Sequence, residues 1–217
     1  MATAAIDTHD AHMGGEHPPT STGLNNTKVA IWAFIGSECF FFASLISTYL
    51  IYRGRSPVGP FPHDAWTDPA TGHVFKAILN IPVTSVSTFV LLMSSLAMVL
   101  AHSAVVRGDR RSSKIWLAST ALLGATFLGF QIFEYHHAYT ELNLKLSSGA
   151  YGSTFFMLTG FHGFHVFVGM MMLLFITIRL MKGHFTPQRH FGFEGAAWYW
   201  HFVDVVWLGL YVVVYWL

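Results

Sequence analysis

Charged residues are scarce in this 217-residue chain, where Asp, Glu, Lys and Arg together make up only 11%. A soluble domain carries about 25%, so these residues are too few to cover a surface that faces water. Hydrophobic residues make up 53% and the mean hydropathy is +0.47, which predicts an integral membrane protein. The formal net charge is +1, so the chain lacks the basic field expected of a nucleic-acid-binding protein.

Cysteine is also nearly absent. Cys39 is the only one, which excludes an intrachain disulfide and any zinc, iron–sulfur or c-type haem site built on a CxxC motif. The chain does contain 13 histidines, and whether they bind a metal is the main chemical question that the composition raises.

Residues 1–27 contain no long apolar run, and no Lys or Arg precedes Lys28. The segment therefore lacks the charged start and hydrophobic stretch of a signal peptide. We predict a flexible polar tail over 1–27, with solvated histidines, followed by a single membrane domain over 28–217.

Long apolar segments fill the rest of the chain. Each is long enough to cross a hydrocarbon core of about 30 Å, which needs roughly 20 helical residues, and segments this long and continuous span lipid as helices. The sequence predicts an all-α bundle with five transmembrane helices, at Val29–Tyr52, Ile78–Val106, Ile115–Tyr139, Tyr151–Met181 and Glu194–Leu217.

The basic residues are distributed unequally between the two sides that this topology defines. Cytoplasmic segments carry an excess of Lys and Arg, so the larger set predicts a cytoplasmic N-terminus and a C-terminus on the opposite side. The larger set is Lys28, Arg107, Arg110, Arg111, Lys114, Arg179, Lys182 and Arg189, and the smaller set is Arg53, Arg55, Lys76 and Lys145.

A few ionisable residues lie within the predicted spans. Such a group costs roughly 2.5–3.5 kcal/mol at the bilayer centre, so it marks a functional site by default. With a rise of about 1.5 Å per residue, most of them fall near the middle of the membrane, and we expect them to face one another and pair inside the bundle. They are Glu38, His162, His165, His201 and Asp204.

Glu38 is the most informative of these residues, because it lies in the apolar stretch GSECFFF beside Cys39. Apolar surroundings disfavour the charged form of a carboxyl group unless a cation pairs with it. Two interpretations stay open: Glu38 exchanges protons, or it is a protonated or histidine-paired hydrogen bond between helices.

The histidines also allow a redox cofactor to be considered. His162 or His165 together with His201 are candidates for the axial ligands of a b-type haem, and Glu134, His136 and His137 form a fragment of a di-iron pattern. These groups are spread along the helices rather than convergent, which favours a hydrogen-bonded polar network and no metal bound by this chain.

Other patterns indicate packing and lipid contacts. Ala121, Ala125 and Gly129 form a stripe of small residues that predicts close helix packing. Aromatic residues near the end of the chain are expected in interfacial belts; these are Trp198, Tyr199, Trp200, Tyr215 and Trp216. Arg179, Lys182 and His184 follow one another at the cytoplasmic end of the fourth span, where they are candidates to bind lipid phosphates; the alternative is that they only extend toward water.

With these residues laid out, the chain resembles subunit III of the haem–copper oxidases, most closely the cytochrome c oxidase branch. The resemblance runs from about Lys28 to Leu217 and is most specific in YGSTFFMLTGFHGFHV (151–166) and HFGFEGAAWYWHFVDVVWLGLYVVVYW (190–216). It implies a non-catalytic subunit of a proton-pumping respiratory oxidase in a bacterial plasma membrane. Haem and copper are then expected in partner subunits I and II, with cytochrome c as an indirect partner.

The resemblance also implies roles for individual residues. Glu38 matches the family's buried carboxyl and Arg179 its lipid-binding arginine, within a cleft that holds structural phospholipid. The subunit is expected to sustain proton uptake and oxygen access in the catalytic subunit.

Two departures from the family pattern leave alternatives open. The long form of the family has seven helices and this sequence matches the last five, so part of the lipid cleft is expected to be missing or supplied by another subunit. The usual histidine pair after the second span is His102-Ser103 here. A quinol oxidase subunit III or a nitric-oxide-reductase accessory protein is the alternative function, although the WYWHFVDVVW run favours the cytochrome c branch.

Overall fold

The computed structural model describes residues 26–53, 55, 65–75, 80–142, 144–147, 149–186 and 190–217. The predicted flexible tail lies almost entirely outside the described residues. Within them, five helices are long and apolar enough to cross a membrane, which confirms the predicted fold class.

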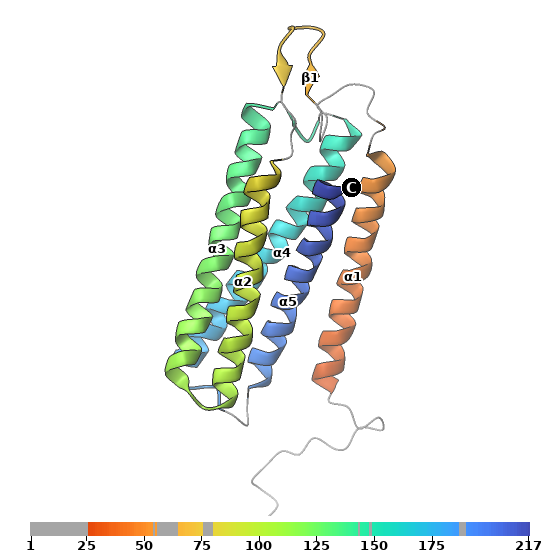
Figure 1. Cartoon of the computed structure of the whole chain (residues 1–217). Helices are drawn as coiled ribbons and strands as arrows, with labels where there is room; N and C mark the ends of the chain where they lie inside the picture. The colour runs from red at the N-terminus through yellow and green to blue at the C-terminus, as the bar shows by residue number, and fades with distance from the viewer. Residues whose placement is uncertain are drawn as a thin grey trace, which may run out of the picture.

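The chain alternates in direction through the bundle (Figure 1). It begins with α1 (Asn26–Tyr52), continues through a small hairpin of β1 (Trp66–Thr67) and β2 (Val74–Phe75), and then forms α2 (Ile81–Val106), α3 (Arg110–Thr140), α4 (Ala150–Met181) and α5 (Phe191–Tyr211), which ends in the π-helical turn η2 (Val212–Trp216). We call the end of the bundle where α1 starts the Asn26 end, and the opposite end the hairpin end.

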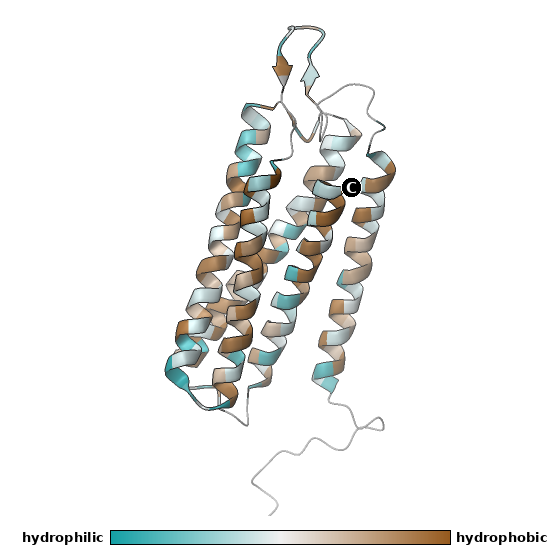
Figure 2. Cartoon of the chain, in the orientation of Figure 1, coloured by the Kyte–Doolittle hydropathy of each residue, from teal (hydrophilic) through white to brown (hydrophobic). Residues whose placement is uncertain are grey.

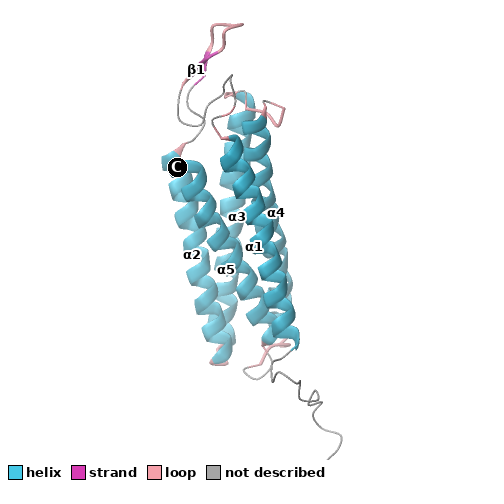
Figure 3. Ribbon diagram, turned by 90° about the vertical axis from the view of Figure 1, so that its right-hand side faces the viewer, coloured by secondary structure: helices cyan, strands magenta, loops and turns pink. Residues whose placement is uncertain are grey.

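Hydrophobic residues cover the helices along most of their length, and hydrophilic residues gather at the Asn26 end of α2 and α3 (Figure 2). The two strands are antiparallel, with Trp66 opposite Phe75 and Thr67 opposite Val74. The hairpin projects beyond the helices (Figure 3), so polar loops and the strands lie outside the apolar layer.

Helix α1 stands at the edge of the bundle, where it contacts α4 and α5. Only Phe42 and Tyr49 are buried on it. Its other faces carry large exposed apolar side chains such as Trp32 and Phe40, which in a membrane protein are surfaces for lipid or for a neighbouring subunit. The contacts that hold α1 are therefore few and identifiable.

The third helix begins five residues earlier than predicted, at Arg110 rather than Ile115, because Asp109 caps it. The Asp109 carboxylate accepts hydrogen bonds of 3.1 Å from the backbone N–H groups of Arg111 and Ser112, which satisfies N–H groups that a helix start leaves unpaired. The polar RRSSK segment is thus the first turn of α3 and extends the helix beyond its apolar part.

This cap makes the start of α3 sensitive to acid. Hydrogen bonds from the side chain and backbone of Ser112, and then from the backbone of Arg111, lower the pKa of Asp109 below its ordinary value. Because the folded state favours the carboxylate, the contribution of the cap is fully present above the ordinary pKa of about 4 and is lost as the pH falls through the lowered pKa. We expect amide hydrogen exchange in the first turn of α3 to accelerate at acid pH beyond its intrinsic pH dependence.

The matched variant is Asp109→Asn, whose amide oxygen still accepts from the helix start but does not titrate in this range. In Asp109→Asn, amide hydrogen exchange in the first turn of α3 should change with pH only as the intrinsic exchange rate does. Equal pH dependence in the two proteins would show that Asp109 does not control this turn.

Trp200 of α5 fills the centre of the bundle rather than an interfacial belt. Its side chain is 1% exposed, and its ring lies against glycines of two other helices. A Cβ atom added at Gly124 of α3 would lie 2.6 Å from the ring, and one at Gly169 of α4 would lie 3.0 Å from it. The belt prediction is therefore wrong for Trp200, and it is also wrong for Tyr199 and Tyr215, which are buried.

Candidate functional site

Glu38 and His165 form an ion-pair or hydrogen-bond contact between α1 and α4. The Glu38 Oε2 and His165 Nε2 atoms lie 3.1 Å apart, and the two side chains are 20% and 13% exposed. The imidazole lies against the ring of Phe42 of α1, with 5.0 Å between the ring centroids. Two of the predicted polar residues thus pair in apolar, aromatic surroundings, as the sequence predicts.

The second nitrogen of His165 fixes where the protons are. Its Nδ1 atom lies 2.7 Å from the backbone carbonyl oxygen of Phe161, and because a carbonyl only accepts, Nδ1 must carry a hydrogen. The contact between Nε2 and Glu38 then holds one proton, located either on the carboxyl group or on the imidazole. The pair as a whole is neutral in both states, which lowers the cost of placing it within the membrane.

His162 does not join this pair. It is fully buried, its ring stacks on Trp207 of α5 with 4.8 Å between centroids, and Phe127 of α3 meets it edge to face. Both ring nitrogens lack a hydrogen-bond partner among the described residues. Three residues advance a helix by about 300°, so His162 points into the core while His165 points to α1.

His201 and Asp204 of α5 face α2 instead of α4. The His201 Nδ1 atom lies 2.6 Å from the Ser95 hydroxyl oxygen, and Ser95 also lies against the Asp204 carboxyl group. The Asp204 Oδ1 atom is buried and has no hydrogen-bond partner among the residues that the structure describes. His201 and Asp204 therefore lie on the same face of α5, the one that packs against α2.

The expectation that all of these residues pair with one another is wrong. Glu38 and His165 form one site at the α1–α4 contact, whereas His201 and Asp204 form a second site at the α2–α5 contact. His162 lies apart from both, among aromatic rings. Similar depth along the helices does not bring side chains together when the helices present them to different neighbours.

Arg179, Lys182 and His184 line one open cleft at the Asn26 end, with a volume of about 760 Å³. The Arg179 guanidinium lies over the rings of Phe175 and Phe185, at 5.8 and 5.3 Å from their centroids. The cleft also includes Phe191 and Gly192 at the start of α5. The structure therefore brings the three predicted residues together on an aromatic base.

This basic cleft adjoins an apolar groove of about 360 Å³ between α4 and α5. Phe175 and Gly192 line both cavities. Met171, Met172 and Ala196 line the groove but not the basic cleft. Cationic groups next to an apolar groove match the two parts of a phospholipid: a phosphate headgroup and an acyl chain.

Among the described residues, no group of three or more His, Cys, Asp or Glu side chains is placed to hold a metal ion. The di-iron fragment is dispersed, because the Glu134 carboxyl group lies 2.6 Å from the Thr84 hydroxyl oxygen of α2, while His137 pairs with Glu141 at 3.1 Å. His162 and His201 likewise point toward different partners, away from a common haem position.

Comparison with known proteins gives the same family as the sequence motifs. The family model described as cytochrome c oxidase subunit III matches residues 6–217. Cytochrome c oxidase subunit 3 of Gallus gallus is 40% identical over 203 residues, which cover 93% of this chain and 73% of that protein. The chain belongs to the cytochrome c oxidase subunit III family.

Related proteins of the same name support this assignment. Cytochrome c oxidase subunit 3 of Cyprinus carpio is 41% identical and that of Oryctolagus cuniculus is 42% identical, both over 203 residues that cover 93% of this chain and 73% of those proteins. As a member of the subunit III family, the chain is a multi-pass, non-catalytic subunit of a cytochrome c oxidase complex. The resemblance seen in the motifs is confirmed.

The sequence analysis missed the hydroxyl residues of α2 that bind α5. The Trp207 and Trp200 indole N–H groups donate to Thr88 and Ser94, at 2.9 and 3.1 Å, and Ser85 shares a 2.6 Å hydrogen bond with Tyr211. With Ser95 and His201, these contacts form a ladder along the α2–α5 contact in this subunit III protein. The repeated Ser and Thr residues in an otherwise apolar segment are the signal that could have indicated it.

Proposed function

We propose that this chain supports a proton-pumping terminal oxidase of a bacterial plasma membrane, in contact with subunits I and II, by stabilising the complex and sustaining proton uptake and oxygen access in the catalytic subunit. Cytochrome c is then the electron donor of the complex and only an indirect partner of this chain. The predicted orientation, with the Asn26 end cytoplasmic, is part of this proposal.

The Glu38–His165 pair is the observation that carries the proposal. A carboxyl group and an imidazole that share one proton, 3.1 Å apart between two membrane helices, form an arrangement in which the proton can move from one side chain to the other while the pair stays neutral. The other possible role is purely structural, since the pair also fastens α1 to α4.

Purification of the native complex tests the proposed role. We expect this chain to co-elute with oxidase subunits I and II, and the haem and copper spectra to belong to those subunits. Stoichiometric haem or metal in this chain after its separation from the others would contradict a non-catalytic role.

We also propose that Arg179, Lys182 and His184 bind the phosphate of a structural phospholipid whose acyl chain lies in the adjoining α4–α5 groove. The stacking of the Arg179 guanidinium on Phe175 and Phe185 supports this proposal, because it holds the cation in place at the mouth of the groove. A lipid bound there would fill a surface that the described helices leave open.

Arg179→Ala is expected to weaken retention of this phospholipid by about fivefold, which corresponds to about 1 kcal/mol for one basic residue near a headgroup. Native mass spectrometry of the purified complex during stepwise delipidation measures the effect. Arg111→Ala is the matched control, since Arg111 lies at the same end of the bundle but outside the residues that line the cleft. Equal lipid retention in the two variants would contradict the proposed site.

A further inference from the structure

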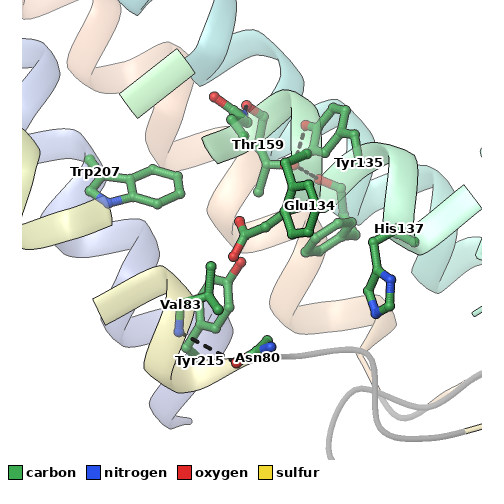
Figure 4. Close-up of a pocket in the computed structure, with 12 residues that line it drawn as sticks. Asn80, Val83, Glu134, Tyr135, His137, Thr159, Trp207 and Tyr215 are labelled. Carbon is green, nitrogen blue, oxygen red and sulfur yellow. Dashed lines mark hydrogen bonds between the residues drawn. The ribbon is translucent and has the colours of Figure 1, made fainter. Parts of the chain in front are cut away.

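A small pocket lies at the hairpin end of the bundle, between α2, α3, α4 and the end of α5 (Figure 4). Its volume is about 40 Å³, and because one water molecule needs about 10–15 Å³ of such space, roughly three water molecules fit. The walls combine apolar side chains with polar groups from each helix. Among the latter are Asn80, Gln131, Glu134 and Thr159.

Gln131 contributes a buried acceptor without a partner. The residue is 7% exposed, and its Nε2 group donates a 2.8 Å hydrogen bond to the Thr159 carbonyl oxygen. This bond fixes the orientation of the amide, and the Oε1 atom then has no partner among the described residues. Buried polar atoms of this kind are commonly satisfied by internal water when the site has room for it.

The hydrogen bonds of Thr84 indicate the protonation state of Glu134. The Thr84 Oγ1 atom lies 3.0 Å from the Asn80 carbonyl oxygen and 2.6 Å from Glu134 Oε1, but a hydroxyl group has only one hydrogen to donate. When Glu134 is protonated, its carboxyl donates to Thr84 and Thr84 donates to Asn80, so both contacts are hydrogen bonds. When Glu134 is ionised, one of them is lost.

The side chains around the Glu134 carboxyl group favour its neutral, protonated form. Figure 4 shows the Tyr215 hydroxyl pointing toward Glu134. The other titratable residues that line the pocket are Tyr135, which shares a 2.6 Å hydrogen bond with Thr159, and His137, whose Nδ1 is held by Glu141 at 3.1 Å. Neither Lys nor Arg is among the lining residues. No lysine or arginine among the described lining residues therefore balances a negative charge on Glu134.

We propose that this pocket holds a cluster of water molecules and that Glu134 is a protonated carboxylic acid whose proton exchanges through that water with the aqueous phase at the hairpin end. In D₂O the O–H bond of Glu134 breaks and an O–D bond forms, while the proton leaves in HOD. The site is separate from the Glu38–His165 pair and does not depend on the function proposed for that pair.

Infrared spectroscopy of the intact oxidase complex tests the proposal. The native complex should show a protonated-carboxyl C=O band that is missing in Glu134→Gln and that moves to lower frequency soon after transfer to D₂O. Glu141→Gln is the matched control, because Glu141 is an exposed carboxyl on the same side, and its replacement should leave the band intact. If the carboxyl band is still present in Glu134→Gln, then Glu134 is ionised in the native complex. If the band does not shift over hours in D₂O, then the pocket is dry. Either result overturns the proposal.

A second variant keeps the carboxyl in place, so the test does not depend on the assembly of Glu134→Gln. Thr84→Val removes the hydroxyl that bonds to Glu134 while preserving shape. The band should then move to higher frequency, because its carboxyl loses a hydrogen bond. An unmoved band in Thr84→Val would mean that the band belongs to another residue and would overturn the assignment.

Discussion

Replacement of Trp200 by alanine is expected to lower the free energy of unfolding of the chain by about 3–5 kcal/mol, the usual cost of removing a large aromatic side chain from a packed core. Trp200 is 1% exposed and fills the space between Gly124 of α3 and Gly169 of α4. The variant would also remove the indole N–H that donates to Ser94. Denaturant unfolding of the chain in detergent micelles measures the change.

The same contact can be tested from the other side. A methyl group at Gly124 would lie 2.6 Å from the Trp200 ring, whereas one at Gly129 would have nothing within 4 Å. Gly124→Ala should therefore cost about 1–3 kcal/mol, as overpacking of a core does, and Gly129→Ala should not destabilise the helix, since alanine is the better helix former. If Gly124→Ala proved as stable as Gly129→Ala, the close packing of Trp200 would be refuted.

Glu38→Gln is expected to preserve assembly of the oxidase but to shorten severalfold the time for which it turns over before inactivation. The amide has nearly the shape of the carboxyl group, and its NH₂ group can donate to His165 Nε2, so the contact between α1 and α4 is retained. The shared proton is lost, because an amide neither accepts nor releases one in this pH range. The measurement is oxygen consumption by the purified complex followed until it stops.

Measurements on two further variants distinguish a proton-exchanging role of Glu38 from a structural one. Glu141→Gln, which changes an exposed carboxyl of the same chain, should behave like the native enzyme. His165→Gln should shorten the turnover lifetime as Glu38→Gln does, because it removes the other member of the pair. An unaltered lifetime and proton uptake in Glu38→Gln would leave Glu38 with a structural role only.

The helices could be predicted from the sequence because a membrane span requires a long apolar segment whatever its neighbours are. The side of each helix that faces the core could not. Lipid is as apolar as the protein interior, so a lipid-facing leucine and a buried one look alike in the sequence. Trp200 and the stripe at Ala121, Ala125 and Gly129 show this: the tryptophan is central, while Ala125 and Gly129 are exposed and Gly124 makes the close contact.

The polar residues were more informative than the apolar ones, but only in part. Glu38 and His165 pair as expected, because a charge at membrane depth needs a partner. His162 differs since its neighbours are the rings of Phe127 and Trp207, and nothing in its local sequence distinguishes it from His165. Which partner each polar group meets depends on helix rotation, which is a property of the whole bundle.

The ladder between α2 and α5 has a consequence for how the chain is made. α5 follows α2 in the chain and is therefore synthesised later, so the hydroxyl groups of α2 enter the membrane before the tryptophans that bind them exist. Ser85, Thr88 and Ser94 each donate to a carbonyl oxygen of their own helix, at 2.6–2.7 Å, and accept from α5 with their remaining lone pairs. Before α5 inserts, the hydroxyl hydrogens of α2 are therefore already bonded to carbonyl oxygens of α2. When α5 packs against α2, the bonds between the two helices form without breaking those earlier bonds.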